Sequence, residues 1–227
     1  MSFNINNSQL RNERKFIFFE SHSSIEKLLN SIGAKEIYSL RDVNSIYFDT
    51  YFHKNYYEAI EGIMFRNKLR LRWYGKIFNV KIQPQLENKS RINQHNYKIT
   101  KKLKSFEIQD KFNLINFQKY IQNEKNNDAE TNFYLNNLHS NLLVSYRRKY
   151  FVIGNIRITL DTDLKFINLA KINFFSKSNF LCINKKKIVE LKYGDKFHHE
   201  TYKITEIFNN RLSKFSKYQI GLSETFY

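Results

Sequence analysis

Residues that could cross-link this fold or form a flexible linker are rare. Among 227 residues there are one cysteine, Cys182, one proline, Pro84, and six glycines. A single cysteine excludes a disulfide framework and a thiolate metal cluster, and this usage fits a reducing cytoplasm best. The scarcity of proline and glycine argues against a flexible linker between domains. We therefore expect one domain over residues 1–227.

Long apolar runs are also missing. No uninterrupted hydrophobic stretch approaches the length of a membrane span, and the N-terminal MSFNINNSQLRNE lacks the apolar core of a signal peptide. The chain also lacks a P-loop, kinase motifs and a Gly-x-Ser-x-Gly elbow, and its six histidines show no recognisable metal-binding spacing. We expect a soluble cytoplasmic protein whose residues 1–10 form a flexible N-terminus.

Acidic residues are few relative to basic ones. The chain has 38 Lys and Arg against 21 Asp and Glu, a formal net charge of +17. Such a charge favours anionic partners, which include nucleic acid, an acidic membrane and polyphosphate, without choosing among them. With 21 Phe and 15 Tyr the composition is that of a globular protein.

Most of the chain has the period-two pattern of β-strands. Helices are expected at 24–32, which starts with the capping-box sequence SSIE, and at 52–61, and the polar segment of about 98–140 is expected to be a helical and loop insertion. The expected strands are 14–20, 43–49, 63–74, 77–83, 89–97, 142–152, 155–163 and 185–193. Eight strands are enough to close a barrel, so the fold class is α+β, mainly β.

The charges follow the same alternation. Lys68, Arg70 and Arg72 share one face of their strand, opposite Leu69, Leu71 and Trp73. The pattern recurs around Lys15, Lys81, Lys89, Arg91, Arg157 and Lys192. These faces could be solvated, or they could line the interior of a barrel and converge on a chain of phosphates. Glu190, the acid of a basic strand, could hold a divalent metal or form a salt bridge with Lys192.

Short motifs, taken in order, resemble those of the VTC (vacuolar transporter chaperone) domain of polyphosphate polymerases, within the triphosphate tunnel metalloenzymes. They are Arg11-x-Glu13-x-Lys15, Ser45-Ile46-Tyr47-Phe48-Asp49-Thr50, Lys68-x-Arg70-x-Arg72-x-Tyr74, the Lys81 strand, Lys89-Ser90-Arg91, Tyr146-x-Arg148-x-Tyr150, Arg157-Ile158-Thr159-Leu160-Asp161, Glu190-Leu191-Lys192-Tyr193 and Ser216-Lys217-Tyr218. Each motif is common, but the ordered set is specific and spans residues 11–218.

The resemblance implies a closed eight-stranded antiparallel β-tunnel with a basic interior and peripheral helices. It implies transfer of the γ-phosphoryl of ATP to a growing inorganic polyphosphate chain, assisted by Mn²⁺ or Mg²⁺. We expect Glu190 to be the metal ligand, with Glu13 in support. The catalytic or phosphate-binding positions are expected to be Lys15, Arg70, Arg72, Lys81, Lys89, Arg91, Arg148, Arg157, Lys192 and Lys217. The expected partners are ATP, polyphosphate and a membrane protein outside this chain, and not nucleic acid.

One departure from the family concerns a strand that usually reads Glu-x-Lys. Here it is matched to Asn79-Val80-Lys81, and the alignment could slip there by two residues. Tyr47, Phe48, Asp49 and Thr50 are interpreted as structural, with aromatic packing and a turn-forming aspartate.

Three other functions are open. A tunnel-type triphosphatase or NTPase is disfavoured because Arg11 stands where hydrolytic relatives generally have the first Glu of Glu-x-Glu-x-Lys. A non-catalytic module could bind polyphosphate or inositol polyphosphates. A nucleic-acid binder fits the charge, but no such signature is present.

Overall fold

The computed structural model describes residues 4–6, 11–92, 95–183 and 185–225. Its main element is a ten-stranded antiparallel sheet. The strands are β1 (Asn4–Asn6), β2 (Arg11–Phe18), β3 (Lys35–Asp49), β4 (Arg66–Tyr74), β6 (Gln85–Ile92), β7 (His95–Lys102), β10 (His139–Ile153), β11 (Ile156–Asn168), β13 (Leu181–Ile183) and β14 (Lys187–Gly194). The protein is therefore α+β and mainly β, as the alternation predicts.

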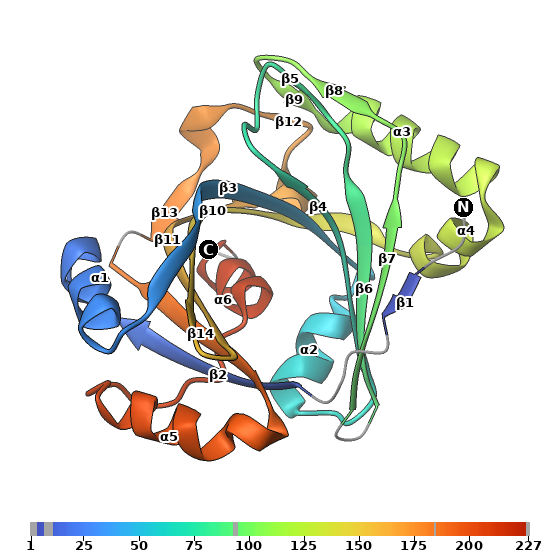
Figure 1. Cartoon of the computed structure of the whole chain (residues 1–227). Helices are drawn as coiled ribbons and strands as arrows, with labels where there is room; N and C mark the ends of the chain where they lie inside the picture. Colours follow the sequence, from blue (N-terminus) through green and yellow to red (C-terminus); the bar gives the residue numbers. More distant parts are fainter. Residues whose placement is uncertain (1–3, 7–10, 93–94, 184, 226–227) are drawn as a thin grey trace.

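The sheet is strongly curved but open. Its hydrogen-bonded order is β1-β7-β6-β4-β3-β10-β11-β14-β2, with β13 beside β11. Among the described residues no backbone pairing joins β2 to β1, β6 or β7, so the expected closed barrel is not confirmed. Instead a side-chain contact links the edge strand β2 to β6, the third strand from the other edge, because Glu13 lies 3.6 Å from Lys89. Figure 1 shows how strongly the sheet curves.

Six α-helices are found in the described part of the chain. They are α1 (His22–Ser31), α2 (Lys54–Glu61), α3 (Leu114–Asn127), α4 (Ala129–Leu135), α5 (His198–Glu206) and α6 (Lys217–Thr225). Three 3₁₀ turns cover Leu169–Lys171, Lys177–Asn179 and Asp195–Phe197. None of the helices in this part combines the length and the apolar character that a bilayer crossing requires.

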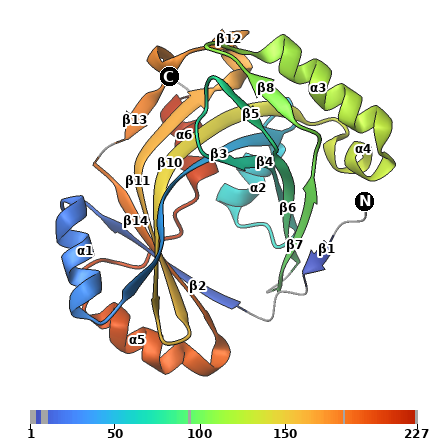
Figure 2. The same cartoon turned by 45° about the horizontal axis from the view of Figure 1, so that its top comes forward.

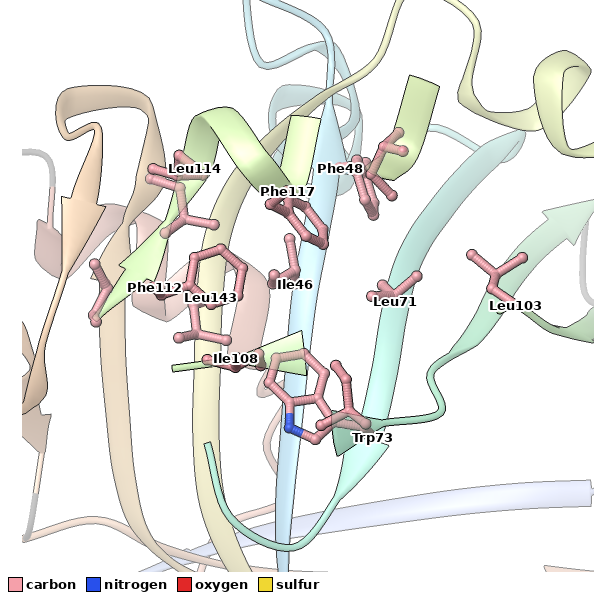
Figure 3. Packing of buried hydrophobic residues seen from close by; sticks show 14 of the residues in the cluster. Ile46, Phe48, Leu71, Trp73, Leu103, Ile108, Phe112, Leu114, Phe117 and Leu143 are labelled. Atoms are coloured by element: carbon pink, nitrogen blue, oxygen red, sulfur yellow. The ribbon is translucent and has the colours of Figure 1, made fainter. Parts of the chain in front are cut away.

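The apolar faces of the strands point outward, toward the covering helices. Leu71 and Trp73 of β4 pack with Ile46 of β3 and with Phe117 of α3 (Figure 3). Two small sheets complete this layer, β5 (Val80–Ile82) with β8 (Phe106–Ile108), and β9 (Phe112–Asn113) with β12 (Phe174–Phe175). A second outer cluster, which includes Leu29 and Ile204, buries residues of α1 and α5 against β2, β11 and β14. The residues that alternate with this outer face point to the concave side, which carries charged residues such as Arg70 and Arg72 as well as the apolar Leu142 and Phe166.

Helix α6 lies inside the curve of the sheet (Figures 1 and 2). Its residues Tyr218 and Leu222 pack against Leu142 and Phe166 of the inner face. Gly221 permits this approach, since a Cβ at this position would lie 2.2 Å from a ring carbon of Phe166. The buried Asp49 also links α6 to α2. It accepts hydrogen bonds from the Tyr218 hydroxyl at 2.6 Å and from backbone amides at the start of α2.

Several expected elements differ from the observed ones. The single strand expected at 89–97 is the antiparallel pair β6 and β7, in register from Gln85↔Lys102 to Ile92↔His95. The strand expected at 77–83 shrinks to β5, which belongs to a separate small sheet. Residues 98–140 contain the end of β7 together with β8, β9, α3 and α4. Within residues 1–10, Asn4–Asn6 form β1 on β7, and the remainder lies outside the described residues.

Candidate functional site

Cationic side chains gather on the concave side of the sheet. They come from six strands and from α6, because the residues alternating with the buried apolar ones all face the same space. We call this set the basic face: Lys15, Lys68, Arg70, Arg72, Lys89, Lys98, Arg148, Lys192 and Lys217. Four carboxylates lie among these cations: Glu13, Glu87, Asp161 and Glu190. The cations outnumber the acids, so the face keeps a positive surplus.

Glu87 is the carboxylate on the β4–β6 side. It accepts from Arg70 Nε at 2.7 Å and from Lys98 Nζ at 2.9 Å, and Arg72 Nη1 lies 3.7 Å away. Burial would raise the pKa of Glu87, but the nearby cations hold it well below its usual range. The carboxylate is therefore ionised and fixes the guanidinium of Arg70 in position.

Asp161 does the same on the opposite wall. Its oxygens accept from Arg148 at 2.5 and 2.7 Å and from Lys217 Nζ at 2.6 Å. Because Lys217 begins α6, this contact ties the helix to the sheet. Burial disfavours the charged carboxylate, but Arg148 and Lys217 lower the pKa of Asp161.

Glu13 and Glu190 lie on the paired strands β2 and β14. Glu190 contacts Lys192 Nζ at 2.7 Å, and Glu13 contacts Lys15 Nζ at 2.5 Å. Burial and mutual repulsion would raise the pKa of Glu13, but Lys15, Lys89 and Lys192 lower it. Burial would also raise the pKa of Glu190, and its neighbouring cations, Lys192 first, hold it well below its usual range.

Lys68 has no carboxylate within salt-bridge distance in the described part of the chain. Its Nζ donates to the Ser216 hydroxyl at 3.1 Å. Burial, together with the charges of Lys15, Arg66 and Lys89, outweighs the opposing effect of Tyr47 and lowers the pKa of Lys68 to about 8. A cation held among cations gains most from a bound anion, so Lys68 marks where an anion would relieve repulsion.

Tyr47 takes part in the basic face as well as in packing. Its ring stacks on Tyr218 with centroids 5.1 Å apart, in line with the structural interpretation. Its hydroxyl accepts from Arg70 Nη1 at 3.1 Å. Burial would raise the pKa of Tyr47, but Arg70, Arg72 and Lys217 lower it to about 8. The sequence interpretation missed this electrostatic role.

The structure does not bring every expected residue onto the basic face. Lys81 is exposed on β5, opposite Glu107 of β8, in the small outer sheet. Arg157 follows the inward-facing alternation of β11 opposite Lys192, but its side chain is exposed. Arg91 lies in β6 opposite Arg66, and its side chain is outside the described residues.

The Glu-x-Lys pattern expected in the family occurs in β6 and not in β5. Glu87 and Lys89 both face the basic face, beside Arg70 and Lys68 of β4. The match to Asn79-Val80-Lys81 stays a prediction, and Glu87-Asn88-Lys89 is a second Glu-x-Lys sequence, one that lies on the basic face itself. Glu87 was missed although it stands two residues before Lys89, which was itself a candidate. Lys68 shared the alternation of Arg70 and was left out of the expected set, whereas Lys98 carried no motif.

The carboxylates limit which metal this face could hold. No group of three or more His, Cys, Asp or Glu side chains suited to a metal ion occurs among the described residues. Glu190 and Glu13 are close enough to interact electrostatically, and each is paired with a lysine. These residues fit an Mg²⁺ or Mn²⁺ ion that takes most of its ligands from substrate phosphates and water, and they do not fit a fully protein-bound metal.

The fold and the site define a mainly β protein with a curved antiparallel sheet and cations fixed on its concave face. Residues 10–226 match the VTC domain family, and the chain belongs to that family. No curated protein matches the sequence.

Solved structures share the fold at low sequence identity. A proposed adenylate cyclase from Vibrio parahaemolyticus has 13% identity and a TM-score of 0.54, with 95% of this chain and 98% of the other covered. Another, from Bacillus halodurans, has 10% identity and a TM-score of 0.54 over the whole of both chains. A Pyrococcus horikoshii protein has 12% identity and a TM-score of 0.52, with 94% and 99% covered.

Proposed function

We propose that this protein is a polyphosphate polymerase, which transfers the γ-phosphoryl of ATP to the end of an inorganic polyphosphate chain and releases ADP. The observation that carries the proposal is the basic face, where cations from both walls and from α6 exceed the carboxylates and Lys68 has no acidic partner among the described residues. Membership of the VTC domain family supports it. The cytoplasmic location and a membrane-protein partner stay predictions.

In this proposal the fixed guanidinium groups position the reacting phosphates. Arg70 is held by Glu87 and Arg148 by Asp161, so neither needs to reorganise when a phosphate oxygen arrives. The lysines Lys68, Lys89 and Lys217 supply charge to phosphates along the chain. Phosphoryl transfer needs mainly alignment of the attacking and leaving oxygens and neutralisation of charge, which this set provides without a protein nucleophile.

A divalent cation would be held by Glu190, with Glu13 in support, and by phosphate oxygens. When bound, it would neutralise charge on the transferred group. Glu190 would then exchange its contact with Lys192 for the metal. The freed lysine ammonium would be available to the phosphate chain.

The decisive assay supplies ATP with Mn²⁺ or Mg²⁺, with and without a short polyphosphate primer. We expect polymer on a polyphosphate-stained gel and an amount of ADP that matches the phosphate incorporated. Orthophosphate without polymer would replace the proposal with a hydrolase, and binding without turnover would replace it with a binding module.

Two lysine variants link this activity to the basic face. Lys68→Gln removes a cation that makes no salt bridge in the described part of the chain. It should lower kcat/KM by roughly 10-fold or more, because a hydrogen bond to a charged group is lost. Lys81→Gln removes an exposed lysine of the outer sheet and should leave kcat/KM unchanged. Equal effects of the two substitutions on kcat/KM would show that the activity does not depend on the basic face.

A further inference from the structure

One end of the concave side has aromatic rings between its cations. Arg148 lies over the ring of Tyr146 at 5.2 Å and over that of Tyr150 at 5.9 Å. Arg41 lies over Tyr150 at 5.7 Å and over Tyr38 at 4.8 Å. These five residues form a ladder of alternating tyrosine and arginine along β10 and β3, which run side by side in Figures 1 and 2.

The ladder leads from the phosphate-binding residues to solvent. Tyr146 is buried, Tyr150 is half-buried, and Tyr38 is 51% exposed. The inner end of the ladder meets the basic face at two residues. One is Arg148, which donates to Asp161, and the other is Lys217, whose Nζ lies 4.6 Å from the ring centroid of Tyr146. A ligand could therefore reach the basic face with one part and the exposed rings with another.

Tyr74 extends the aromatic surface from β4. It follows Arg72 in the inward alternation, stands opposite Val43 of β3, and is 50% exposed. The hydrogen bond from the Gly75 amide to the Asp42 carbonyl, at 3.0 Å, holds the end of β4 beside the Arg41 segment. Burial raises the pKa of the Tyr150 hydroxyl, and Tyr74 adds to the rise.

Packing accounts for these exposed groups only in part, since Tyr38 meets Tyr150 edge to face with ring centroids 5.6 Å apart. Tyr38 and Tyr74 leave about half of their surface in water, and they belong to none of the hydrophobic clusters of the described residues. Arg41 is exposed, and in the described part of the chain its contacts are the two tyrosine rings and no carboxylate. Flat aromatic faces beside an unpaired guanidinium are the features by which proteins stack nucleobases.

We propose that Tyr38, Arg41, Tyr74 and Tyr150 form a nucleoside site, in which the base of a nucleoside triphosphate stacks on the exposed tyrosines while its phosphates extend to Arg148 and the basic face. The site deepens the proposed function, on which it rests, by assigning the nucleotide to the Tyr38–Tyr74 end of the concave side. Stacking reads the face of a base and not its hydrogen-bonding edge, so adenine and guanine are held alike.

Calorimetric titration without divalent metal tests the site, because it needs no turnover. Wild-type protein is titrated with ATP, GTP and inorganic tripolyphosphate, which has the phosphates without the base. Tyr38→Ala and Tyr74→Ala should each weaken ATP and GTP binding by about 5- to 20-fold, the lower part of the range for one stacked base, and leave tripolyphosphate affinity within twofold. Tyr38→Phe should restore nucleotide affinity, because the ring remains.

Tyr57→Ala is the matched control. Tyr57 has the same 51% exposure as Tyr38 but lies on α2, and its removal should change neither affinity. Equal losses for nucleotide and tripolyphosphate, or no loss for either, would overturn the nucleoside site. Wild-type protein that binds tripolyphosphate but no nucleotide would overturn this site alone, whereas protein that binds neither would overturn the anion-binding proposal as well.

Discussion

At the scale of single residues, the cations of the basic face differ in how they are compensated. Arg70 and Arg148 each contact a buried carboxylate, which offsets the charge of the guanidinium group and holds it in position. Lys68 contacts a serine hydroxyl and is surrounded by Lys15, Arg66 and Lys89. Groups that a folded protein holds at a cost to stability are commonly retained for function.

Lys68→Met should therefore stabilise the free protein and weaken triphosphate binding. Because the pKa of Lys68 is about 8 when folded, below its unfolded value near 10.5, the folded state binds this proton less tightly. The loss of folding free energy caused by charged Lys68 is therefore complete below pH 8, and it disappears as the pH rises toward 10.5. At pH 7 we expect a gain of roughly 1 kcal/mol, discounted for the solvent that reaches this side chain. Denaturant titrations at pH 7 and pH 10 measure it, and the gain should shrink at pH 10.

Exposed Lys81 gives the comparison for that experiment. Lys81→Met should leave stability at both pH values within about 0.5 kcal/mol, as is usual for surface substitutions. An equal gain from both substitutions would assign the effect to the methionine side chain and not to relief of the buried charge.

Glu190→Gln should have opposite effects with and without metal. Without metal, the substitution removes a negative charge beside Lys192, Lys15 and Arg148, so tripolyphosphate should bind several-fold more tightly. With Mn²⁺, the substituted protein loses its principal candidate ligand, and the increase in affinity caused by the metal should fall. Titrations in EDTA and in Mn²⁺ separate the two effects. Unchanged metal dependence would leave Glu190 with its lysine contact alone.

At the scale of elements, the sequence predicts strands better where apolar and charged residues alternate without interruption. The alternation around Lys68–Trp73 predicts both β4 and the face on which Arg70 and Arg72 lie. The pair β6 and β7 was read as one strand because no glycine or proline occurs in residues 85–102 to mark a turn. That error also hid Glu87, whose role depends on which strand pairs with β4.

Helix α6 shows a different limit of sequence reasoning. Its motif Ser216-Lys217-Tyr218 is recognisable, but its position inside the sheet depends on long-range contacts with Leu142 and Phe166. No local pattern in residues 217–225 specifies a partner that is about 50 to 80 positions earlier in the chain. The same holds for Asp161, which lies on one strand while its cations come from another strand and a helix.

Gly221→Ala tests the seating of α6 on the sheet. Alanine at an exposed helical position is normally more favourable than glycine by about 1 kcal/mol. Here the new Cβ would lie 2.2 Å from the Phe166 ring and 2.7 Å from Leu142, so either the ring or the helix must move. We expect a loss of about 1–3 kcal/mol in the free energy of unfolding, measured by denaturant titration. Ser223→Ala, at an exposed position of the same helix, should change stability little, and a stabilising Gly221→Ala would contradict the packing.

At the scale of the whole molecule, the sheet is a curved wall whose edges are not joined by backbone pairing among the described residues. Lys15 lies on the edge strand β2, and Lys89 and Lys68 lie on β6 and β4, the third and fourth strands from the other edge. Glu13 contacts Lys15, Lys89 and Lys192. Its side chain therefore links β2 to β6 across the seam where the sheet stays open. A polyanion bound to the basic face would contact cations from both sides of this seam.

Binding of tripolyphosphate should therefore tighten the seam between β2 and β6. At a ligand concentration of about 100 times Kd, the folded state gains about 2.7 kcal/mol, and the melting temperature should rise accordingly. Hydrogen exchange should slow at the amides of β2 and β6 more than at those of α3, which lies on the outer face. Sulfate at matched ionic strength controls for screening of the +17 charge and should protect these strands less. Glu13→Gln removes the existing link, so the free protein should exchange faster at β2 while the bound protein returns to the protected state. Protection spread evenly over the whole sheet would mean that the ligand stabilises the fold without bridging its edges.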